Sequence, residues 1–411
     1  MPTLAQQRRT IITCFLGWTL DAFDFFVMIF LITDLAGAFH VGVTAVTWAV
    51  TATLVLRVVG AAFFGRLSDR LGRKPILIIN ILAFSAVELA TGFSPTLTVF
   101  LILRALFGIA MGGQWGVAAS LTMESIPAHW RGWASGLLQS GYSVGYMLAA
   151  VYYGFAHDLL GWRGMFIVAV IPALLVVLLA STLPESPVWQ QQRLKKQASL
   201  ATVVRTNWKL FLYAMILMFA AATMSHGTQD LYPVMLKVQH RLSIHQVATI
   251  ATIYNIGGLL GCLCGGILSQ KIGRRWELVL ASAGMLILMP FWGLCSSLIA
   301  VTVTAFFMQF LVQCNFGVMP AHLNEMSPSA VRGTFPGFAL QFGNMLAAGN
   351  ATLQSLLADS LHKNYGVALS LVAGLGAIAF CLLAYFGPDA RDVKMSDESV
   401  PVSATTGTAR G

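Results

Sequence analysis

The chain of 411 residues is 57% hydrophobic, and only 10% of its residues are charged. A soluble domain carries about 25% charged residues, so this composition excludes a soluble enzyme, a disordered chain and a disulfide scaffold and indicates an integral membrane protein. The formal net charge of +9 does not indicate nucleic-acid binding, because the basic residues stand in short clusters between apolar runs.

Apolar runs, taken in chain order, predict twelve membrane-spanning segments. Each run approaches or exceeds the roughly 20 residues that a spanning helix needs. The runs do not alternate as barrel strands do, so we expect an all-α integral membrane protein. The expected spans are 11–37, 45–66, 75–93, 97–122, 132–155, 162–182, 208–235, 246–269, 276–295, 298–323, 333–357 and 364–387.

The basic residues predict the orientation of the chain. An even number of spans places both termini on one side of the membrane. Nineteen of the 25 Lys and Arg residues lie at the termini and in the loops on that side, against four in the opposite loops. Cytoplasmic loops are enriched in Lys and Arg, so both termini are expected in the cytoplasm. The short loops suit a bacterial inner membrane.

The longest predicted cytoplasmic connection divides the chain into two halves. We expect an N-terminal six-helix bundle over 1–183, a cytoplasmic linker over 184–207 and a C-terminal six-helix bundle over 208–387. The polar tail over 388–411 has the composition of a disordered segment.

The two halves repeat each other. The segment Gly65–Lys74 follows the second span, and Gly266–Arg275 follows the eighth, with glycines and basic residues matched at an offset of 201. The same offset maps Gly116 to Gly317, Glu124 to Glu325, Pro127 to Pro328, Arg131 to Arg332 and Gly132 to Gly333. One offset over so many positions predicts a duplicated six-plus-six membrane fold with a pseudo-two-fold repeat.

These residues resemble the major facilitator superfamily. Its most specific motif, Gly-x-x-x-Asp-Arg-x-Gly-Arg-Lys, is present at Gly65–Lys74, and Arg104 with Gly108 and the run Pro184–Pro187 also fit. The resemblance covers residues 11–387. It implies two bundles that rock about a central substrate site lined by the first, fourth, seventh and tenth spans.

Two acids lie inside the first predicted span. Asp21 and Asp24 are three residues apart and therefore share one helix face. Two neighbouring carboxylates in a low dielectric are costly to ionise together, and this suits proton uptake and release. The alternative is a structural pair bonded to neighbouring helices.

The seventh predicted span carries a second polar group. His226, Gln229 and Asp230 fall on one helix face. His226 titrates near neutral pH and can donate to a substrate carboxylate, while Asp230 can hold the imidazole or exchange the proton. The alternative is a polar gate that seals the extracellular side.

The run from Ser225 to Asp230 also resembles the seventh-helix signature of the sialate:proton symporter branch, which includes lactate/pyruvate permeases. The six core positions match, whereas Ala222 and Val234 stand where that signature has Asn and Thr. The first-span pair, Asp21 with Asp24, is similar to an element of aromatic-acid:proton symporters. Both resemblances imply transport of an organic anion with a proton.

Four further polar residues lie inside predicted spans. Arg57 needs an anionic partner, which is either one of Asp21, Asp24 and Glu88 or a substrate carboxylate. Arg104 matches the superfamily's buried arginine, and this implies a role in proton coupling. Gln114 and Asn315 are related by the offset of 201 and are expected either to bind substrate oxygens or to join helices.

Charges in the predicted cytoplasmic loops resemble the superfamily's ion-pair network. Such a network closes the cytoplasmic side in the outward-open state and breaks in the inward-open state. In the second half Gln270 replaces the acid of the motif, so that half's network is expected to be weaker. The expected gate residues are Gly65, Asp69, Arg70, Gly72, Arg73, Glu124, Arg131, Glu185, Glu325 and Arg332.

These features predict a proton-coupled symporter that imports a small organic anion, with lactate or pyruvate as the leading substrate. Sialic acid and an aromatic acid are alternative substrates, and an uncoupled facilitator is the alternative of another class. The sequence contains no phosphate-binding or hydrolytic motif. We therefore expect no catalytic residue, no cofactor and no metal, and we expect a monomeric functional unit.

Overall fold

The computed structural model describes residues 3–193 and 200–388. The described residues form helices and no strand. Part of the expected linker, with Lys195 and Lys196, lies outside the described residues. So does the expected tail beyond residue 388.

The helices fall into two halves joined by two short helices. The first half contains α1 (Leu4–Phe30), α2 (Ile32–Ala38), α3 (Val43–Leu71), α4 (Arg73–Gly92), α5 (Leu97–Gly112), α6 (Gln114–Ser125), η1 (Ala128–Trp130), α7 (Arg131–Val168) and α8 (Val170–Ser181). The joining helices are α9 (Pro187–Arg193) and α10 (Leu200–Thr206). The second half contains α11 (Trp208–Gln229), α12 (Tyr232–Val238), α13 (Ile244–Ile272), α14 (Arg274–Leu294), α15 (Leu298–Met326), η2 (Ser329–Val331), α16 (Phe335–Ala347), α17 (Asn350–Ser360) and α18 (Tyr365–Phe386).

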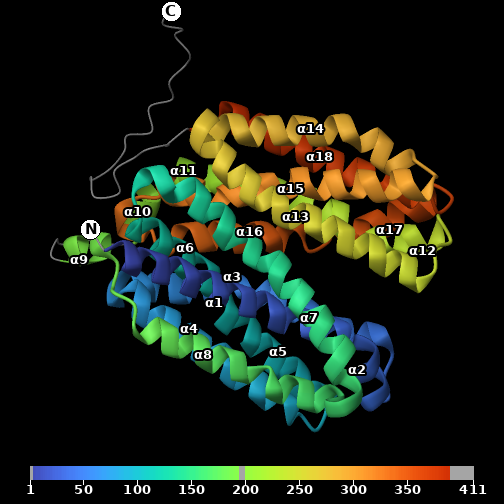
Figure 1. Cartoon of the computed structure of the whole chain (residues 1–411), viewed down its shortest axis with the longest axis horizontal. Coiled ribbons are helices and arrows are strands. Elements are labelled where there is room, and N and C mark those ends of the chain that lie inside the picture. Colours follow the sequence, from blue (N-terminus) through green and yellow to red (C-terminus); the bar gives the residue numbers. More distant parts are fainter. Residues whose placement is uncertain (1–2, 194–199, 389–411) are drawn as a thin grey trace, which may run out of the picture.

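Each half packs as a bundle, and the two bundles lie side by side (Figure 1). Helices α7, α3 and α6 of the N-terminal bundle face α13, α16 and α15 of the C-terminal bundle. The chain start, α9 and α10 lie at one end of the molecule, which is the predicted cytoplasmic end. Toward α2 and α12 the bundles diverge.

The described helices account for twelve membrane passes. Ten stretches are long and apolar enough to cross a membrane by length and composition. One of them, Ala128–Ser181, has 54 residues and bends at Gly161, where φ is 58°, so it supplies two passes. Helices α16 and α17 together form the remaining pass. The predicted all-α, twelve-span membrane fold is confirmed.

Several spans that the sequence predicts as continuous are broken. The first ends at Leu31 and resumes as α2, and its repeat in the second half resumes as α12. The fourth is divided at Gly113, and the eleventh at Ala348 and Gly349. Hydropathy measures the length of an apolar run. A break of one or two residues between helices leaves the run apolar, so hydropathy does not detect it.

Two glycines of the repeated motif make sharp junctions between spans. Gly72 joins α3 to α4 with φ of 112°, and Gly273 joins α13 to α14 with φ of 101°. This backbone region favours glycine. A Cβ atom at Gly72 would also lie 2.3 Å from Oε2 of Glu185. The motif glycine therefore permits both the turn and the approach of that carboxylate.

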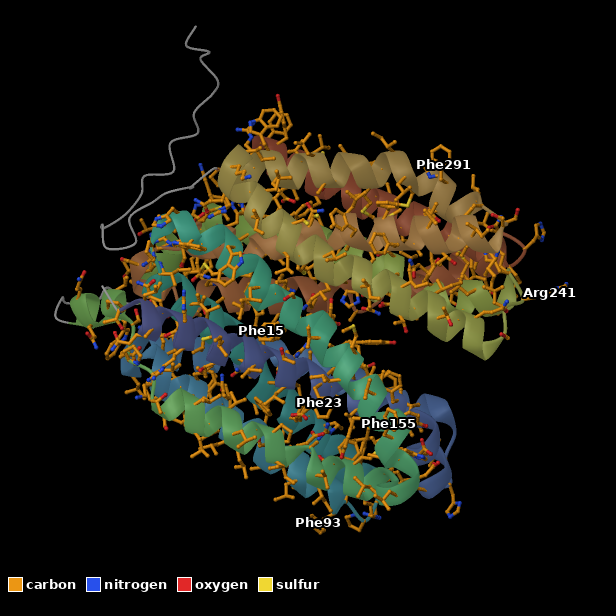
Figure 2. All side chains as sticks on the ribbon, in the orientation of Figure 1. Phe15, Phe23, Phe93, Phe155, Arg241 and Phe291 are labelled. Carbon is orange, nitrogen blue, oxygen red and sulfur yellow. The ribbon has the colours of Figure 1, made fainter. Side chains whose placement is uncertain are left out.

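Large apolar side chains cover the outside of both bundles. Phe291 stands on the outer face of α14, and Phe93 and Phe155 lie at the far end of the N-terminal bundle (Figure 2). All three are exposed. An exposed apolar surface of this extent suits contact with lipid.

Candidate functional site

Buried charges gather in the core of the N-terminal bundle. Arg57 of α3 is 5% exposed and pairs with Asp21 of α1, with 3.1 Å between Nη2 and Oδ2. The guanidinium carbon of Arg57 lies 5.5 Å from the centre of the Phe25 ring, and its Nε has no hydrogen-bond partner. Among the partners that the sequence leaves open, the structure selects Asp21, and part of the guanidinium stays available to another group.

A second ion pair lies beside the first. Arg104 of α5 donates to Oε2 of Glu88 at 2.7 Å and to the hydroxyl of Thr91 at 2.6 Å. The ring of Phe107 lies 4.3 Å from the guanidinium carbon. A carboxylate inside a membrane span is costly and needs a partner. The sequence left Glu88 open only as a partner of Arg57, whereas the structure pairs it with Arg104.

Asp24 completes this group, which we call the carboxylate cluster: Asp21, Asp24, Arg57, Glu88 and Arg104. Asp24 is 2% exposed, its Oδ1 has no hydrogen-bond partner, and it lies within electrostatic range of Glu88, Asp21 and Arg104. Three carboxylates face two guanidinium groups, so the fully ionised cluster carries one uncompensated negative charge. Burying an unpaired charge is costly, and one bound proton makes the cluster neutral.

The polar group of α11 forms two side-chain pairs. Nδ1 of His226 lies 3.1 Å from Oδ1 of Asp230, and about a third of each side chain is exposed. Gln229 donates to the hydroxyl of Ser225 at 2.7 Å. The pair of His226 with Asp230 is therefore formed and remains partly accessible, while Gln229 bonds to Ser225.

Tyrosines connect this face with the carboxylate cluster. Tyr142 of α7 lies within electrostatic range of both Arg57 and Asp230. Tyr254 of α13 lies within range of Asp230, Tyr142 and Tyr146. Groups from both bundles thus converge between them. No sequence pattern distinguishes Tyr254 from the other aromatic residues.

The two amides related by the offset of 201 point into their own bundles. Gln114 is fully buried, and its side chain packs against Gly17 of α1. Asn315 accepts from the hydroxyl of Ser282 at 3.3 Å and donates to the carbonyl of Leu311 at 3.0 Å. The contacts described for both amides lie within their own bundles and not at the accessible face of α11.

The motif charges form a network at the predicted cytoplasmic end. Arg73 lies 2.9 Å from Oδ1 of Asp69 and 3.1 Å from Oε1 of Glu124. Glu185 accepts from the backbone N–H of Arg73 at 2.9 Å, and burial raises the pKa of this carboxyl. Arg70, in contrast, is exposed.

This network also joins the two bundles. Asp69 accepts from the backbone N–H of Gly333 at 2.8 Å and from the hydroxyl of Thr334 at 2.6 Å. Arg332 is buried next to them, and burial lowers its pKa to about 10. The bundles are therefore held together at this end.

The second half repeats the network with a neutral acceptor. Arg274 lies 3.0 Å from Oε1 of Glu325 and donates to Gln270 at 2.9 Å. Gln270 accepts from the backbone N–H of Gly132 at 3.1 Å, which repeats the bond between Asp69 and Gly333. Arg131 lies 3.9 Å from Glu325. Gln270 therefore makes the same contact between the bundles as Asp69 does, but without a negative charge.

Two buried serines also join the bundles. Ser120 donates to the backbone carbonyl of Arg332 at 2.7 Å, and Ser135 donates to that of Gly317 at 2.6 Å. Small hydroxyls inside apolar helices are common and carry no pattern that identifies a partner.

The Gly65→Leu variant is expected to loosen this contact. A Cβ atom at Gly65 would lie 2.7 Å from Cα of Thr334, and overpacking costs about 1–3 kcal/mol. Hydrogen–deuterium exchange of the peptide 329–335 should therefore accelerate. Gly154→Leu is the matched control, because nothing lies within 4 Å of that position. Unchanged protection in Gly65→Leu would contradict the packing described.

The chain matches the Major Facilitator Superfamily over residues 14–348 and 230–406. It is 29% identical to the "Carboxylic acid transporter protein homolog" of Saccharomyces cerevisiae, over 84% of this chain and 60% of that protein. It thus spans about three fifths of that relative's length.

Two bacterial relatives are covered over most of their length. The "Probable 4-methylmuconolactone transporter" of Cupriavidus pinatubonensis is 30% identical over 92% of this chain and 88% of the relative. The "Sialic acid transporter NanX" of Escherichia coli is 27% identical over 93% and 94%, respectively.

A solved structure shares the fold. The proton:xylose symporter XylE aligns with a TM-score of 0.80 at 20% identity, covering 96% of this chain and 98% of that one. The chain belongs to the major facilitator superfamily and is a membrane transporter, not an enzyme.

Proposed function

We propose that the protein is a proton-coupled symporter that imports a small organic anion by alternating access, with a monocarboxylate such as lactate or pyruvate as the leading substrate. The observation that carries this proposal is the carboxylate cluster, which is neutral only with one proton bound. The names of the relatives, which include carboxylic acid, muconolactone and sialic acid transporters, support an organic-acid substrate.

Arg57 and His226 are the proposed anion-binding residues. Arg57 uses Nη2 for Asp21, while its Nε has no partner. A guanidinium carries five N–H donors, so it can hold Asp21 and a substrate carboxylate together. His226 faces the same region from α11 and is paired with Asp230, which fixes the imidazole orientation. Gln229 adds an amide on that face.

Asp24 is the proposed proton carrier. Asp21 and Glu88 each have an arginine within 3.1 Å, whereas Asp24 has none at that distance. The charges of the bound proton and the bound anion then cancel, so the loaded site has the same net charge as the empty site. Crossing the membrane costs less for such a neutral load than for a bare anion.

The conformation described is closed at the predicted cytoplasmic end. The contacts of Asp69 with Gly333 and of Gln270 with Gly132 join the bundles there. In the proposed cycle, proton and anion bind from the opposite side, and both contacts break as the bundles rock. The bacterial inner membrane, with both termini in the cytoplasm, is the proposed location.

A flat aromatic acid is the second candidate substrate. Tyr142 stacks on Trp18 with ring centres 6.1 Å apart, and Phe26 meets Tyr142 and Tyr146 edge-on at 5.3 and 4.7 Å. Aromatic rings of this kind bind flat ligands by offset or edge-on contact. Sialic acid is less suited, because a polyol needs many hydrogen-bonding partners.

The proposal is tested by uptake of labelled lactate into proteoliposomes with and without an inward proton gradient. Pyruvate, benzoate and sialic acid are added as competitors. Stimulated lactate uptake supports the proposal as stated. Gradient-driven uptake of a competitor alone keeps the mechanism and replaces the substrate. Lactate uptake at the same rate with and without the proton gradient would contradict symport and support an uncoupled facilitator.

His226→Gln is expected to weaken anion binding and to preserve proton coupling. Losing one hydrogen bond to a charged ligand costs about 1.5–3 kcal/mol, so KM should rise at least tenfold while stimulation by the gradient persists. His157→Gln is the matched control, since His157 also pairs with an aspartate, Asp34, at 2.9 Å. An unchanged KM for His226→Gln would remove this residue from the site.

A further inference from the structure

Unpartnered polar atoms gather between α1, α4 and α6 of the N-terminal bundle. Gln114 and Asn80 are fully buried, and neither atom of either side-chain amide has a hydrogen-bond partner. The hydroxyl of Ser125 is buried and unpartnered as well. Buried polar groups are almost always bonded to protein or to ordered water, so water is the partner that these groups require.

The two amides lie at one level of the bundle, next to the carboxylate cluster. A Cβ atom at Gly17 would lie 2.6 Å from Nε2 of Gln114, and Gly17 is one helical turn from Asp21. A Cβ atom at Gly113 would lie 2.7 Å from Nδ2 of Asn80. Gln114 therefore lies about one turn from Asp21, toward the predicted cytoplasmic end, and Asn80 lies beside Gly113, the residue that precedes Gln114.

Further polar groups continue toward that end. Thr122 of α6 lies beside Cys14 of α1, and Ser125 is the last residue of α6. The neighbouring Glu124 is paired with Arg73 of the gate. A polar track, defined as Asn80, Gln114, Thr122 and Ser125, thus lies between the carboxylate cluster and the gate.

The C-terminal bundle provides an internal comparison. At the offset of 201, the positions equivalent to the unpartnered groups are apolar or hydrogen bonded. Asn80 and Ser125 correspond to Ala281 and Met326. Asn315, the equivalent of Gln114, is bonded to Ser282. The three acids of the cluster correspond to Ala222, Ser225 and Met289. The polar track is therefore specific to the N-terminal half and does not follow from the shared fold.

We propose that the polar track is a hydrated proton route inside the N-terminal bundle, separate from the substrate path between the bundles. This inference rests on the proposed proton coupling. The carboxyl of Asp24 releases its proton to the water held by Gln114 and Asn80, and it becomes a carboxylate. The proton leaves along the track to the cytoplasm. Each amide carries both donors and an acceptor, so it can orient water on either side.

The end of the track explains how proton release follows the bundle movement. In the closed conformation Glu124 is held by Arg73 and by Ser186, whose hydroxyl lies 2.5 Å from Oε2. The track therefore ends against the closed gate. Opening of the gate frees this end at the step in which the substrate also leaves.

The test compares net uptake with exchange in Gln114→Met and Asn80→Leu, which nearly conserve side-chain volume. Net uptake driven by a proton gradient requires proton release on the inner side, whereas exchange of labelled for unlabelled substrate at equal pH does not. We expect net uptake to fall about tenfold or more, which is less than for a lost acid–base group because the amide orients water and does not itself carry the proton, while exchange stays within about twofold of wild type. Asn80→Ser keeps a small polar group and should restore part of the net uptake. Gln354→Met is the control, because Gln354 is an equally buried glutamine of the C-terminal bundle.

Four outcomes are decisive. Loss of net uptake with exchange preserved supports the route. Equal loss of both activities overturns it and assigns the amides to substrate binding or to folding. Full retention of net uptake in both variants also overturns it. If the wild-type protein takes up substrate at the same rate with and without the proton gradient, the proposed function itself is wrong. If one variant does not fold, the other decides between these outcomes.

Discussion

Asp24→Asn is expected to abolish stimulation of uptake by an inward proton gradient. The amide cannot take up a proton, and the carboxylate cluster is then neutral at all times, with Asp21 and Glu88 balanced by the two arginines. We expect gradient-driven uptake to fall about 100-fold or more, the scale of a lost acid–base group. Exchange at equal pH should persist, because it needs no proton release. Uptake into proteoliposomes measures both quantities.

Two comparisons sharpen this prediction. Asp34→Asn removes a carboxylate that pairs with His157 outside the cluster, and it should leave the stimulation intact. Glu88→Gln replaces the charged partner of the buried Arg104 with a neutral amide. It should therefore lower the yield of folded protein as well as the rate of transport. Stimulation that survives in Asp24→Asn would show that another carboxyl carries the proton.

Arg57→Leu is expected to destabilise the protein as well as to stop transport. Asp21 is fully buried, and its bond to Arg57 is 3.1 Å long. Removing one partner of a buried ion pair costs about 3–5 kcal/mol, because it leaves the other charge uncompensated. The Tm of the solubilised protein should therefore fall.

The double variant with Asp21→Asn and Arg57→Gln separates the two roles of the arginine. Both charges disappear together, so most of the lost stability should return, whereas anion binding should not. If the double variant binds and transports the substrate with near wild-type KM, the role of Arg57 is confined to pairing with Asp21.

The architecture was predictable because the membrane imposes simple requirements. A span must be long, apolar and helical, so apolar runs located the spans, and the offset of 201 related the halves. The breaks at Leu31 and Gly113 were not predictable, since helix direction depends on packing against neighbours that hydropathy does not describe.

Within the site, local pairs were more predictable than distant ones. The helical spacing of His226 and Asp230 specified their contact. The partner of Arg57 depended instead on the rotation and depth of three helices, which left Asp21, Asp24 and Glu88 equally available. Gln114 was expected either to bind substrate oxygens or to join helices, and its side chain packs against Gly17 of α1.

The gate illustrates what a substitution pattern can and cannot indicate. Gln270 in place of an acid indicated a weaker network in the second half. The structure keeps the same backbone contact to Gly132, because an amide oxygen accepts a hydrogen bond as a carboxylate does. Only the charge on that acceptor is lost.

The most direct test of the central claim is the proton flux that accompanies the substrate. Purified protein is placed in weakly buffered proteoliposomes, and the external pH is followed when lactate, or whichever acid the competition identifies, is added without an imposed gradient. Proton-coupled import predicts a rise in external pH that is absent in Asp24→Asn. Substrate uptake at the same rate with no change in pH would contradict the account.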